Sequence, residues 1–441
     1  MRYLILSVAL ACCTANPSDP PDAGVDPDGP TGSNDGELPP LRAQVGVAYV
    51  AHFNSGELRS YRLDTNEPAA GPVIDLGVGA HDLAIDVENR RLAVVSDVGR
   101  WVRLYSIDTP ETAGAAIDAP VLAGEVTFES IPRFVTLDPY RDRLYVITAD
   151  PDQSPLEFME LHALDTSDPA AAKPISGWPV QIPVTVSFAL DAVRAVLFVV
   201  DLKADTLTAY DVGGDRFEAL DGEPIALTAV YPQENQFAFQ ARGLTADVRR
   251  NRLVAARSQS ALSELIAFDY PPDIPTAGAR YRDFVTMDEL VMIPDGFDVD
   301  VALDSRPNLL DAYSPAVDQQ TGAVFLSTDA WNGGASSAAV ATFGADASLG
   351  RGCDEVPGEG FGCFLRSYAA RAPGSYLRTD GAICADATHQ RVLATSIDVT
   401  DETAPGAIHV FSYSGDLMSA VLPAGGGDLA SAAFPIGAVC H

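Results

Sequence analysis

A repeated phrase constrains this chain more than any other feature of its sequence. In each copy an apolar run reaches an aspartate, crosses a short polar turn and continues as a second apolar run, as in LAIDVENRRLAVV from Leu83 and FVTLDPYRDRLYVI from Phe134. Six copies place an aspartate at one register: Asp86, Asp138, Asp191, Asp247, Asp318 and Asp386. Short apolar runs bounded by turn-forming residues are typical of β-strands joined in hairpins. The chain is therefore expected to fold as an array of similar β units.

Each unit extends beyond the shared phrase. A third, alternating stretch follows the second apolar run, for example WVRLYSID ending at Asp108, and a weaker fourth stretch comes next, for example APVLAGEV from Ala119. Successive aspartates lie 52 to 71 residues apart, a spacing that suits one four-stranded blade in each repeat. No helical period persists along the chain. The sequence thus predicts an all-β fold, a β-propeller of four-stranded blades over residues 45–441.

The two ends of this region predict how the ring closes. The first unit, which begins near Val47, contains strands two to four but no innermost strand. The last residues, FPIGAVCH from Phe434 to His441, align with the innermost strand of another unit, Ile131 to Asp138. We therefore expect the C-terminal strand to complete the first blade, which closes a ring of seven blades and removes the free sheet edge.

The cysteines of the predicted propeller favour disulfides, because an even number of cysteines in an exported chain indicates pairing rather than thiol chemistry. Cys384 lies on the innermost strand of the last blade, one position before the register that Cys440 occupies in the first blade. Alternate residues of a strand face opposite sides, so these two side chains can meet across the gap between the blades. We predict a Cys384–Cys440 bond that locks the ring and a Cys353–Cys363 bond that closes a glycine-rich loop.

The N-terminus has the pattern of an export signal. Arg2 is followed by the apolar run YLILSVALA and by two adjacent cysteines, which predicts a signal peptide over residues 1–12. Small residues before a cysteine resemble a bacterial lipobox, and either Cys12 or Cys13 suits lipidation; ordinary cleavage near Ala15 is the alternative. Residues 13–44 are rich in Pro, Asp and Gly, so we expect a disordered tether. These features predict an exported protein, lipid-anchored to the bacterial cell envelope at the outer membrane or in the periplasm.

The chain is strongly acidic, with 61 acidic against 28 basic residues and a formal net charge of -33. Such a surface repels polyphosphates, which argues against nucleic acid as a partner and limits membrane contact to the N-terminal lipid. We expect a monomer whose partner is an envelope protein, a peptide or a glycan. No dinucleotide fingerprint, Walker loop or HExxH motif is present, so no organic cofactor is evident.

The second and third strands of the repeats resemble the YVTN/YncE-like β-propeller family. The nearest copies are RLYVITAD from Arg143 to Asp150 and VLFVVDLKADTLTAYD from Val196 to Asp211. The resemblance implies a propeller over residues 45–441 and says little about function, because the family includes binding modules as well as lactonase-like enzymes. This chain departs from the family pattern by carrying aspartate at the asparagine position, for example Asp97.

The six repeated aspartates suit two different roles. They could line the channel as a ring of carboxylates, but a catalytic site is not expected to recur once in every blade. An aspartate directly before a tight turn commonly accepts the backbone N–H groups of that turn. We therefore interpret these residues as structural parts of the turn between strands one and two.

A ligand site in a propeller is expected at one mouth of the central channel. The candidates lie where the innermost strand begins and where strands two and three are joined: His52, His81, Asp82, Arg133, Arg242, Tyr313, Trp331 and Asp380. The two arginines suit an anionic ligand, since guanidinium groups bind oxyanions through forked hydrogen bonds; pairing of each with a nearby acid is the simpler alternative. The histidines suit metal binding or proton transfer, or form a polar rim. No catalytic residue is assigned.

A separate acidic segment lies in an insertion at residues 271–311. Asp295, Asp298 and Asp300 are spaced closely enough to supply oxygen ligands to Ca²⁺, although the segment does not match an EF-hand loop. An ordinary acidic surface loop is the alternative. Ca²⁺ is the one metal cofactor that the sequence suggests.

Taken as a set, these features favour a binding or scaffold module of the cell envelope. The alternative is a lactonase-like hydrolase with its site at one mouth of the channel. The positions of the candidate residues distinguish the two hypotheses. An enzyme requires candidates such as His81, Arg133 and Arg242 to converge on a common point, and scattered positions would favour the binding module.

Overall fold

The computed structural model consists of short antiparallel strands, and no α-helix occurs among the residues that it describes. It describes residues 38, 40, 44–53, 55–65, 70–107, 116–153, 156–185, 187–204, 206–214, 217–220, 224–226, 240–259, 262–270, 280–286, 308–310, 315–332, 335–343, 355–356, 360–361, 364–369, 377–378, 383–398, 407–413, 422–423, 429–430 and 435–440. Within these ranges, no helix has the length and apolar character needed to cross a membrane.

The first four blades follow one another along the chain. Blade one contains β1 (Val47–His52), β2 (Glu57–Arg62), β3 (Ala70–Asp75) and β35 (Pro435–Cys440). Blade two contains β4 (Asp82–Asp86), β5 (Arg91–Ser96), β6 (Trp101–Ser106) and β7 (Val121–Thr127). Blade three contains β8 (Ile131–Asp138), β9 (Arg143–Ala149), β10 (Phe158–Asp165), β11 (Lys173–Pro174) and β12 (Val180–Pro183), with a 3-10 helix at Pro169–Ala171. Blade four contains β13 (Phe188–Asp191), β14 (Val196–Asp201), β15 (Thr206–Asp211), β16 (Glu218–Ala219) and β17 (Ile225–Ala226).

Three further blades complete the part of the chain that is described. Blade five contains β18 (Gln240–Asp247), β19 (Arg252–Gln259), β20 (Leu262–Asp269) and β21 (Arg280–Thr286), with a 3-10 helix at Val248–Arg250. Blade six contains β22 (Asn308–Leu310), β23 (Pro315–Val317), β24 (Val324–Asn332), β25 (Ala335–Phe343) and β28 (Phe364–Ala369). Blade seven contains β29 (Leu377–Arg378), β30 (Ile383–Asp386), β31 (Arg391–Asp398), β32 (Ala407–Ser412), β33 (Leu422–Pro423) and β34 (Leu429–Ala430). A separate hairpin pairs β26 (Glu355–Val356) with β27 (Gly360–Phe361).

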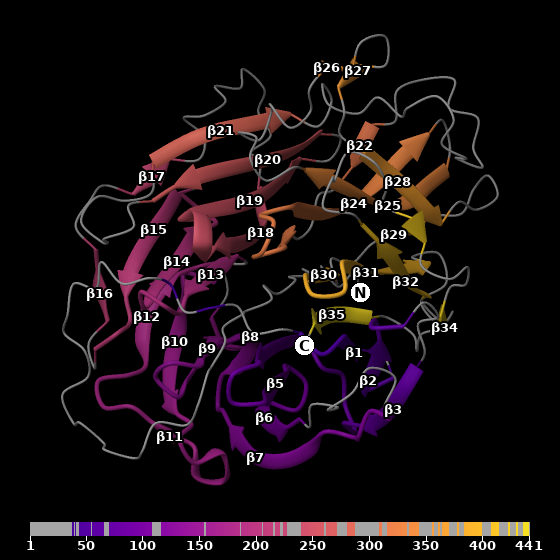
Figure 1. Ribbon diagram of the computed structural model, residues 1–441. Helices are drawn as coiled ribbons and strands as arrows, with labels where there is room; N and C mark the ends of the chain where they lie inside the picture. Colours follow the sequence, from indigo (N-terminus) through magenta and orange to yellow (C-terminus); the bar gives the residue numbers. More distant parts are fainter. Residues whose placement is uncertain are drawn as a thin grey trace.

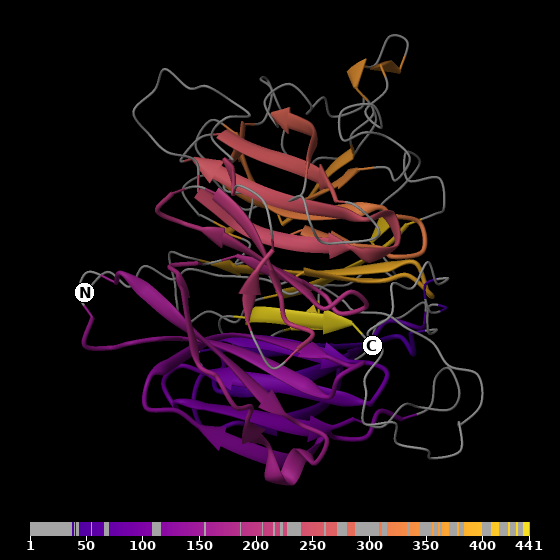
Figure 2. The same ribbon diagram turned by 90° about the vertical axis from the view of Figure 1, so that its left-hand side faces the viewer.

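The C-terminal strand completes blade one, as its alignment with an innermost strand predicts. β35 pairs antiparallel with β1, and it contacts the innermost strands of both neighbouring blades, β4 and β30. Figure 1 shows β8, β18, β30 and β35 around the centre of the molecule, and Figure 2 shows the yellow β35 between indigo and orange-yellow strands. The sulfur atoms of Cys384 and Cys440 are bonded across this junction, and neither cysteine is exposed. The expected disulfide is therefore present where the first and last blades meet.

The turn after each innermost strand has a fixed conformation. Its last residue, four positions after the repeated aspartate, takes a positive φ: Arg90, Asp142, Ala195, Asn251, Gly322 and Gln390. In five of these turns the carbonyl of this residue accepts the N–H of the residue that follows the third strand, for example Ile107 to Arg90 at 3.0 Å. A left-handed residue reverses the chain within a short turn. The second apolar run of each repeat thereby returns alongside the first.

The apolar core lies between neighbouring blades. Innermost and second strands such as β1 and β4 are buried at every position, which explains why their sequences are continuous apolar runs. One cluster joins Tyr49 of blade one, Val94 of blade two and Val135 of blade three, and another joins Val50 of blade one to Leu393 of blade seven. Packing between blades therefore holds the innermost strands in place around the channel.

Candidate functional site

The repeated aspartates are buried residues of the turns, and five of them accept backbone N–H groups as interpreted from the sequence. The acceptor–donor pairs, at 2.7 to 3.1 Å, are Asp86 with Asn89, Asp138 with Tyr140, Asp191 with Arg194, Asp318 with Gln320, and Asp386 with His389. Asp247 differs, because it precedes a 3-10 helix and instead binds the guanidinium of Arg252 at 2.8 Å. These carboxylates therefore stabilise the turns and have a structural role.

The residue three positions after the aspartate links four blades to the next one. Its side chain donates to the backbone carbonyl that follows the aspartate of the neighbouring blade: Asn89 to Pro139, Arg141 to Ala192, Arg194 to Val248, and Arg250 to Gln319. Each of these side chains also binds the aspartate of its own turn. We name these contacts the inter-blade clamps. They engage three basic residues that lie beside the repeated aspartates, Arg141, Arg194 and Arg250.

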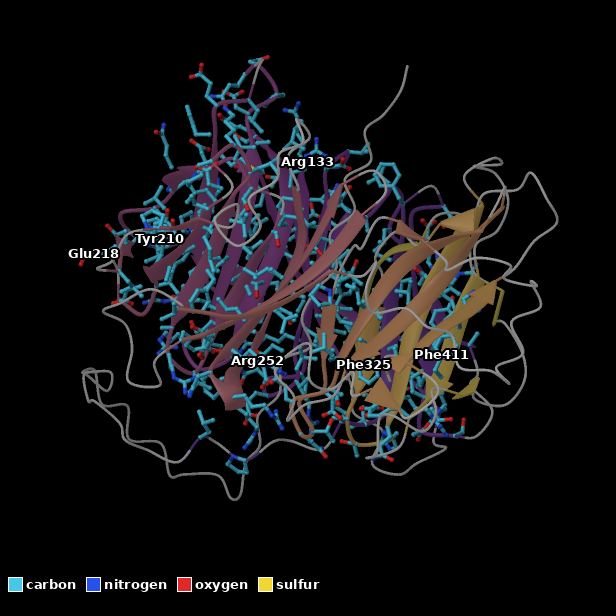
Figure 3. All side chains as sticks on the ribbon, turned by 90° about the horizontal axis from the view of Figure 1, so that it is seen from above. Arg133, Tyr210, Glu218, Arg252, Phe325 and Phe411 are labelled. Carbon is cyan, nitrogen blue, oxygen red and sulfur yellow. A yellow bond between two sulfur atoms is a disulfide. The ribbon has the colours of Figure 1, made fainter. Side chains whose placement is uncertain are left out.

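Arg133 lies at the other end of the strands. The pairing of β8 with β9 shifts register between Pro132 and Phe134, so Arg133 is an extra residue in a β-bulge. Figure 3 shows Arg133 at one end of the strands and Arg252, beside a turn, at the opposite end. A bulge turns a side chain away from its regular direction. The side chain of Arg133 is 36% exposed, so a ligand can reach its guanidinium.

Asp97 is the acidic partner of Arg133 and was not among the site residues expected from the sequence. Arg133 Nη1 lies 3.2 Å from Asp97 Oδ2, which supports the simpler alternative of pairing with a nearby acid. The other oxygen, Asp97 Oδ1, is buried and accepts no hydrogen bond within the described residues. The only sequence signal for Asp97 is its place at the asparagine position of the family repeat.

His81 lies close enough to Asp97 and Arg133 for both charges to affect its pKa: Asp97 raises it and Arg133 lowers it. Its backbone N–H donates to Val95 O at 2.7 Å, and its ring meets the ring of Phe134 edge-on at 5.9 Å between centroids. Burial lowers the pKa of His81 to about 4. The imidazole is therefore neutral near pH 7 and is held in place by its neighbours.

Asp82 is a structural residue at the start of β4 rather than an accessible ligand group. Its carboxylate is fully buried, and it accepts the N–H of Leu83 and the N–H of Val135, each at 2.9 Å. The second bond crosses from blade two to blade three. Burial raises the pKa of Asp82 well above its usual value.

Arg242 occupies the same kind of position as Arg133. The pairing of β18 with β19 shifts register between Ala241 and Gly243, so Arg242 is also a bulged residue. Both arginines lie five residues before the aspartate of their blade, and in the sequence His81 and Tyr313 hold this register in blades two and six. Two innermost strands, β8 and β18, therefore each carry a bulged arginine near their first residue.

The other sequence candidates do not all join this group. His52 ends β1 with no exposed surface, so it is not a rim residue. Trp331 lies on β24, next to the start of the loop that joins strands two and three of blade six. The side chains of Arg242 and Trp331, and all of Tyr313 and Asp380, lie outside what the structure describes. Of the candidates, His81, Asp82 and Arg133 are brought together.

Several further predictions from the sequence also fall outside the described residues. These are the acidic segment with Asp295, Asp298 and Asp300, the Cys353–Cys363 pair, and the lipidation candidates Cys12 and Cys13. Within the described ranges, no group of three or more His, Cys, Asp or Glu side chains could hold a metal ion. The Ca²⁺ hypothesis therefore concerns the insertion at residues 271–311 alone.

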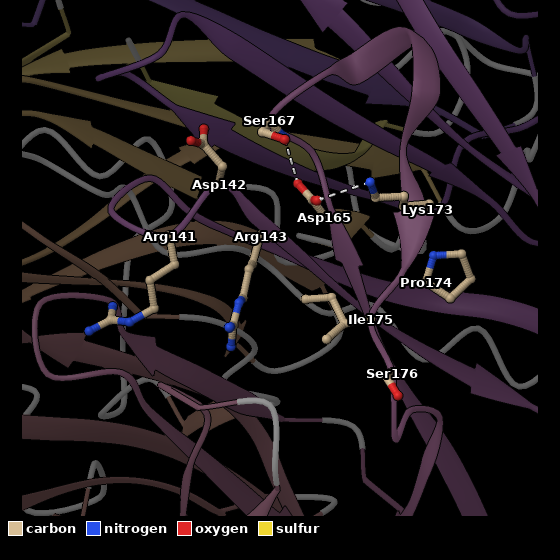
Figure 4. A pocket seen from close by; sticks show the side chains of 9 residues that line it. All are labelled: Arg141, Asp142, Arg143, Asp165, Ser167, Lys173, Pro174, Ile175 and Ser176. Atoms are coloured by element: carbon tan, nitrogen blue, oxygen red, sulfur yellow. Dashed lines mark hydrogen bonds and ion pairs between the residues drawn. The ribbon is translucent and has the colours of Figure 1, made fainter. Parts of the chain in front are cut away.

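A pocket of about 420 Å³ lies on the turn side of blade three (Figure 4). Its lining residues are Arg141, Asp142, Arg143, Asp165, Ser167, Lys173, Pro174, Ile175 and Ser176. Arg141 binds Asp138 and a carbonyl of blade four, Asp142 pairs with Arg91, and Asp165 accepts from Ser167. These contacts are of the same kind as the inter-blade clamps and favour a structural role for the charged groups of this pocket.

Comparison with known proteins shows the fold. No protein-family model matches the chain, and no curated protein matches it. The periplasmic gluconolactonase of Pseudomonas aeruginosa superposes with a TM-score of 0.54 at 14% identity, over 89% of this chain and 98% of that one. A proposed 6-phosphogluconolactonase of Bacteroides uniformis gives 0.54 at 12% identity, over 90% and 99%. A hypothetical selenium-binding protein of Sulfolobus tokodaii gives 0.56 at 13% identity, over 91% and 94%. At these identities the similarity is one of architecture, and it shows that this chain is a β-propeller.

Proposed function

We propose that this protein is a lipid-anchored binding module of the bacterial cell envelope, and that it binds an anionic glycan at the channel mouth around Arg133. The observation that carries the proposal is the bulge at the start of β8, which holds a partly exposed guanidinium where a ligand can reach it. Arg242 begins β18 in an equivalent bulge. Two arginines at one register suit the carboxylates of a glycan, which accept forked hydrogen bonds.

The sequence supports the location in the envelope. The export signal over residues 1–12, Cys12 or Cys13 as the lipidated residue, and the Pro/Asp/Gly tether over residues 13–44 fit a domain held away from a membrane by its N-terminus. The acidic surface disfavours polyphosphates, so the anionic glycan of this proposal is recognised locally by the two arginines and not attracted by the overall charge. We also propose that the repeats are of the YVTN/YncE-like type, since RLYVITAD coincides with β9 and VLFVVDLKADTLTAYD with β14 and β15.

Isothermal titration with trigalacturonate tests the binding proposal. We expect Arg133→Ala and Arg242→Ala each to raise the Kd roughly 10- to 100-fold, because each removes a charge-assisted hydrogen bond worth about 1.5 to 3 kcal/mol. Arg103→Ala is the matched control, since Arg103 is bound to Glu125 at 2.7 Å on the outer strands of blade two. Wild-type affinity in both mouth variants would refute this function.

A second candidate function is a lactonase-like hydrolase. It is favoured by the fold similarity to proteins named gluconolactonase and 6-phosphogluconolactonase. His81, kept neutral by burial, and Arg133, a hydrogen-bond donor to a carbonyl oxygen, would be the groups nearest a bound ester. Hydrolysis of D-glucono-1,5-lactone above the uncatalysed rate, lost in Arg133→Ala, would support the hydrolase. Hydrolysis at the uncatalysed rate would reject the hydrolase and retain the binding module as the proposed function.

A further inference from the structure

The dipeptide His81–Asp82 contacts blade three at Phe134 and Val135, the two residues that follow Arg133. We infer that His81 and Asp82 are positioning residues, which hold the bulge of β8 in the geometry that presents Arg133 to a ligand. The inference rests on the proposed function, in which Arg133 binds the ligand. Neither residue is assigned a direct contact with the ligand, because Asp82 has no exposed surface and His81 is 9% exposed.

Asp82 fixes the strand just after the bulge. Its two carboxylate oxygens are used by two backbone N–H groups, one in its own strand and one at Val135 of β8. A bulge interrupts the regular hydrogen-bond ladder, so the chain near it needs other partners. A buried carboxylate that accepts a backbone N–H supplies a strong bond of this kind, and its loss leaves Val135 without that acceptor.

His81 holds the residue next to the bulge. Its backbone N–H donates to Val95 O of β5 at 2.7 Å, and its ring contacts the ring of Phe134, the residue after the bulge, edge-on across the blade boundary. A neutral imidazole beside Arg133 avoids the repulsion that two cations would produce. The two positioning residues thus act on successive parts of one segment.

Blade four provides an internal comparison, because it precedes the other bulged arginine. Ser187 lies four residues before Asp191, as Asp82 lies four residues before Asp86. The Ser187 hydroxyl is buried and has no hydrogen-bond partner within the described residues, so it forms no bond like that of Asp82 to the next blade. Serine is therefore compatible with this position in the fold, and of the two blades compared, blade two forms the additional bond to the next blade.

A double-mutant cycle on the full-length protein tests the inference. Asp82→Ser introduces the residue that blade four carries at the same register. With trigalacturonate as the probe, we expect Asp82→Ser to raise the Kd roughly tenfold, the scale of one lost hydrogen bond to a buried group, and to have no further effect in an Arg133→Ala background. Asp82→Asn serves as a second variant if the serine variant folds poorly. Asp191→Asn, which removes a buried carboxylate from a turn at the other end of the strands, should leave the Kd unchanged.

Hydrogen–deuterium exchange without ligand separates this inference from the proposed function. We expect the amides of residues 131–138 to exchange faster in Asp82→Ser than in the wild type, and to keep the wild-type rate in Asp191→Asn. If the wild type does not bind trigalacturonate, the proposed function fails and the exchange data still decide whether Asp82 holds the bulge. Equal effects of Asp82→Ser on Kd with and without Arg133, or unchanged exchange, would overturn the inference.

Discussion

His162 is a half-buried histidine on β10 whose ring contacts Thr148 Oγ1 at 3.1 Å and Phe128 edge-on. Burial lowers its pKa from 6.5 to about 4. Between these two values the unfolded chain binds more protons than the folded protein, so the stability falls as the pH decreases through this window. We expect wild type to lose about 2 kcal/mol more than His162→Gln between pH 7 and pH 4.5. Urea unfolding of both proteins at the two pH values measures this difference, and equal losses would contradict the lowered pKa.

Residue roles could be predicted from the sequence only where a repeat reveals them. The six aspartates recur before polar turns, so their structural role follows from local turn chemistry, and five of them accept the expected N–H bonds. The bulge at Arg133 could not be predicted, because it depends on how β8 and β9 pair in space. The burial of His52 could not be predicted for the same reason: its position at the end of a strand suggests the rim, whereas it has no exposed surface in the folded protein.

At the scale of the elements, tyrosines after the third strands join neighbouring blades. Tyr270 follows β20 and donates to Asp191 Oδ2 of blade four at 2.9 Å; Tyr413 follows β32 and donates to Asp318 Oδ2 of blade six at 2.9 Å. Each bond links a third strand to the turn of the preceding blade. The sequence shows both tyrosines, but the link joins residues 79 and 95 positions apart, and no local pattern marks it.

We expect Tyr270→Phe and Tyr413→Phe each to lower the free energy of unfolding by about 1 to 3 kcal/mol, because each leaves a buried carboxylate with one donor fewer. The two losses should add, since the sites share no partner. Chemical denaturation measures both, and Tyr140→Phe is a control at a tyrosine that is 40% exposed. Losses no larger than in this control would show that the hydroxyl bonds are not stabilising.

Strand number and blade organisation were predictable from the period, because every unit must bury the same apolar faces against its neighbours. The inter-blade clamps were not, although Asn89, Arg141, Arg194 and Arg250 stand at one register of the repeat. Their acceptors are backbone carbonyls, which have no sequence signature. The turns that contain the repeated aspartates and the inter-blade clamps lie at the same end of the blades. Together they explain why basic residues of an acidic chain lie near these turns.

At the scale of the whole molecule, the ring depends on the junction between its first and last blades. β35 pairs with β1 and contacts β30, so a strand from the end of the chain completes a sheet formed at its beginning. The Cys384–Cys440 bond crosses this junction with a sequence separation of 56 residues. A bond that closes a loop of this length restricts the unfolded chain and is worth about 4 kcal/mol on the chain-entropy model.

We therefore expect Cys384→Ser/Cys440→Ser to lower the free energy of unfolding by about 4 kcal/mol relative to the wild type. Denaturant unfolding under non-reducing conditions measures the difference, and under reducing conditions the wild type and the double variant should unfold alike. A double variant as stable as the wild type would mean that the junction needs no covalent bond.

Peptide mapping of the unreduced protein by mass spectrometry tests ring closure most directly. The predicted result is one cross-linked species that joins a peptide containing Cys384 to the C-terminal peptide containing Cys440, and that separates on reduction. Free thiols at both positions, or pairing of Cys440 with Cys353 or Cys363, would contradict a ring in which the C-terminal strand completes the first blade.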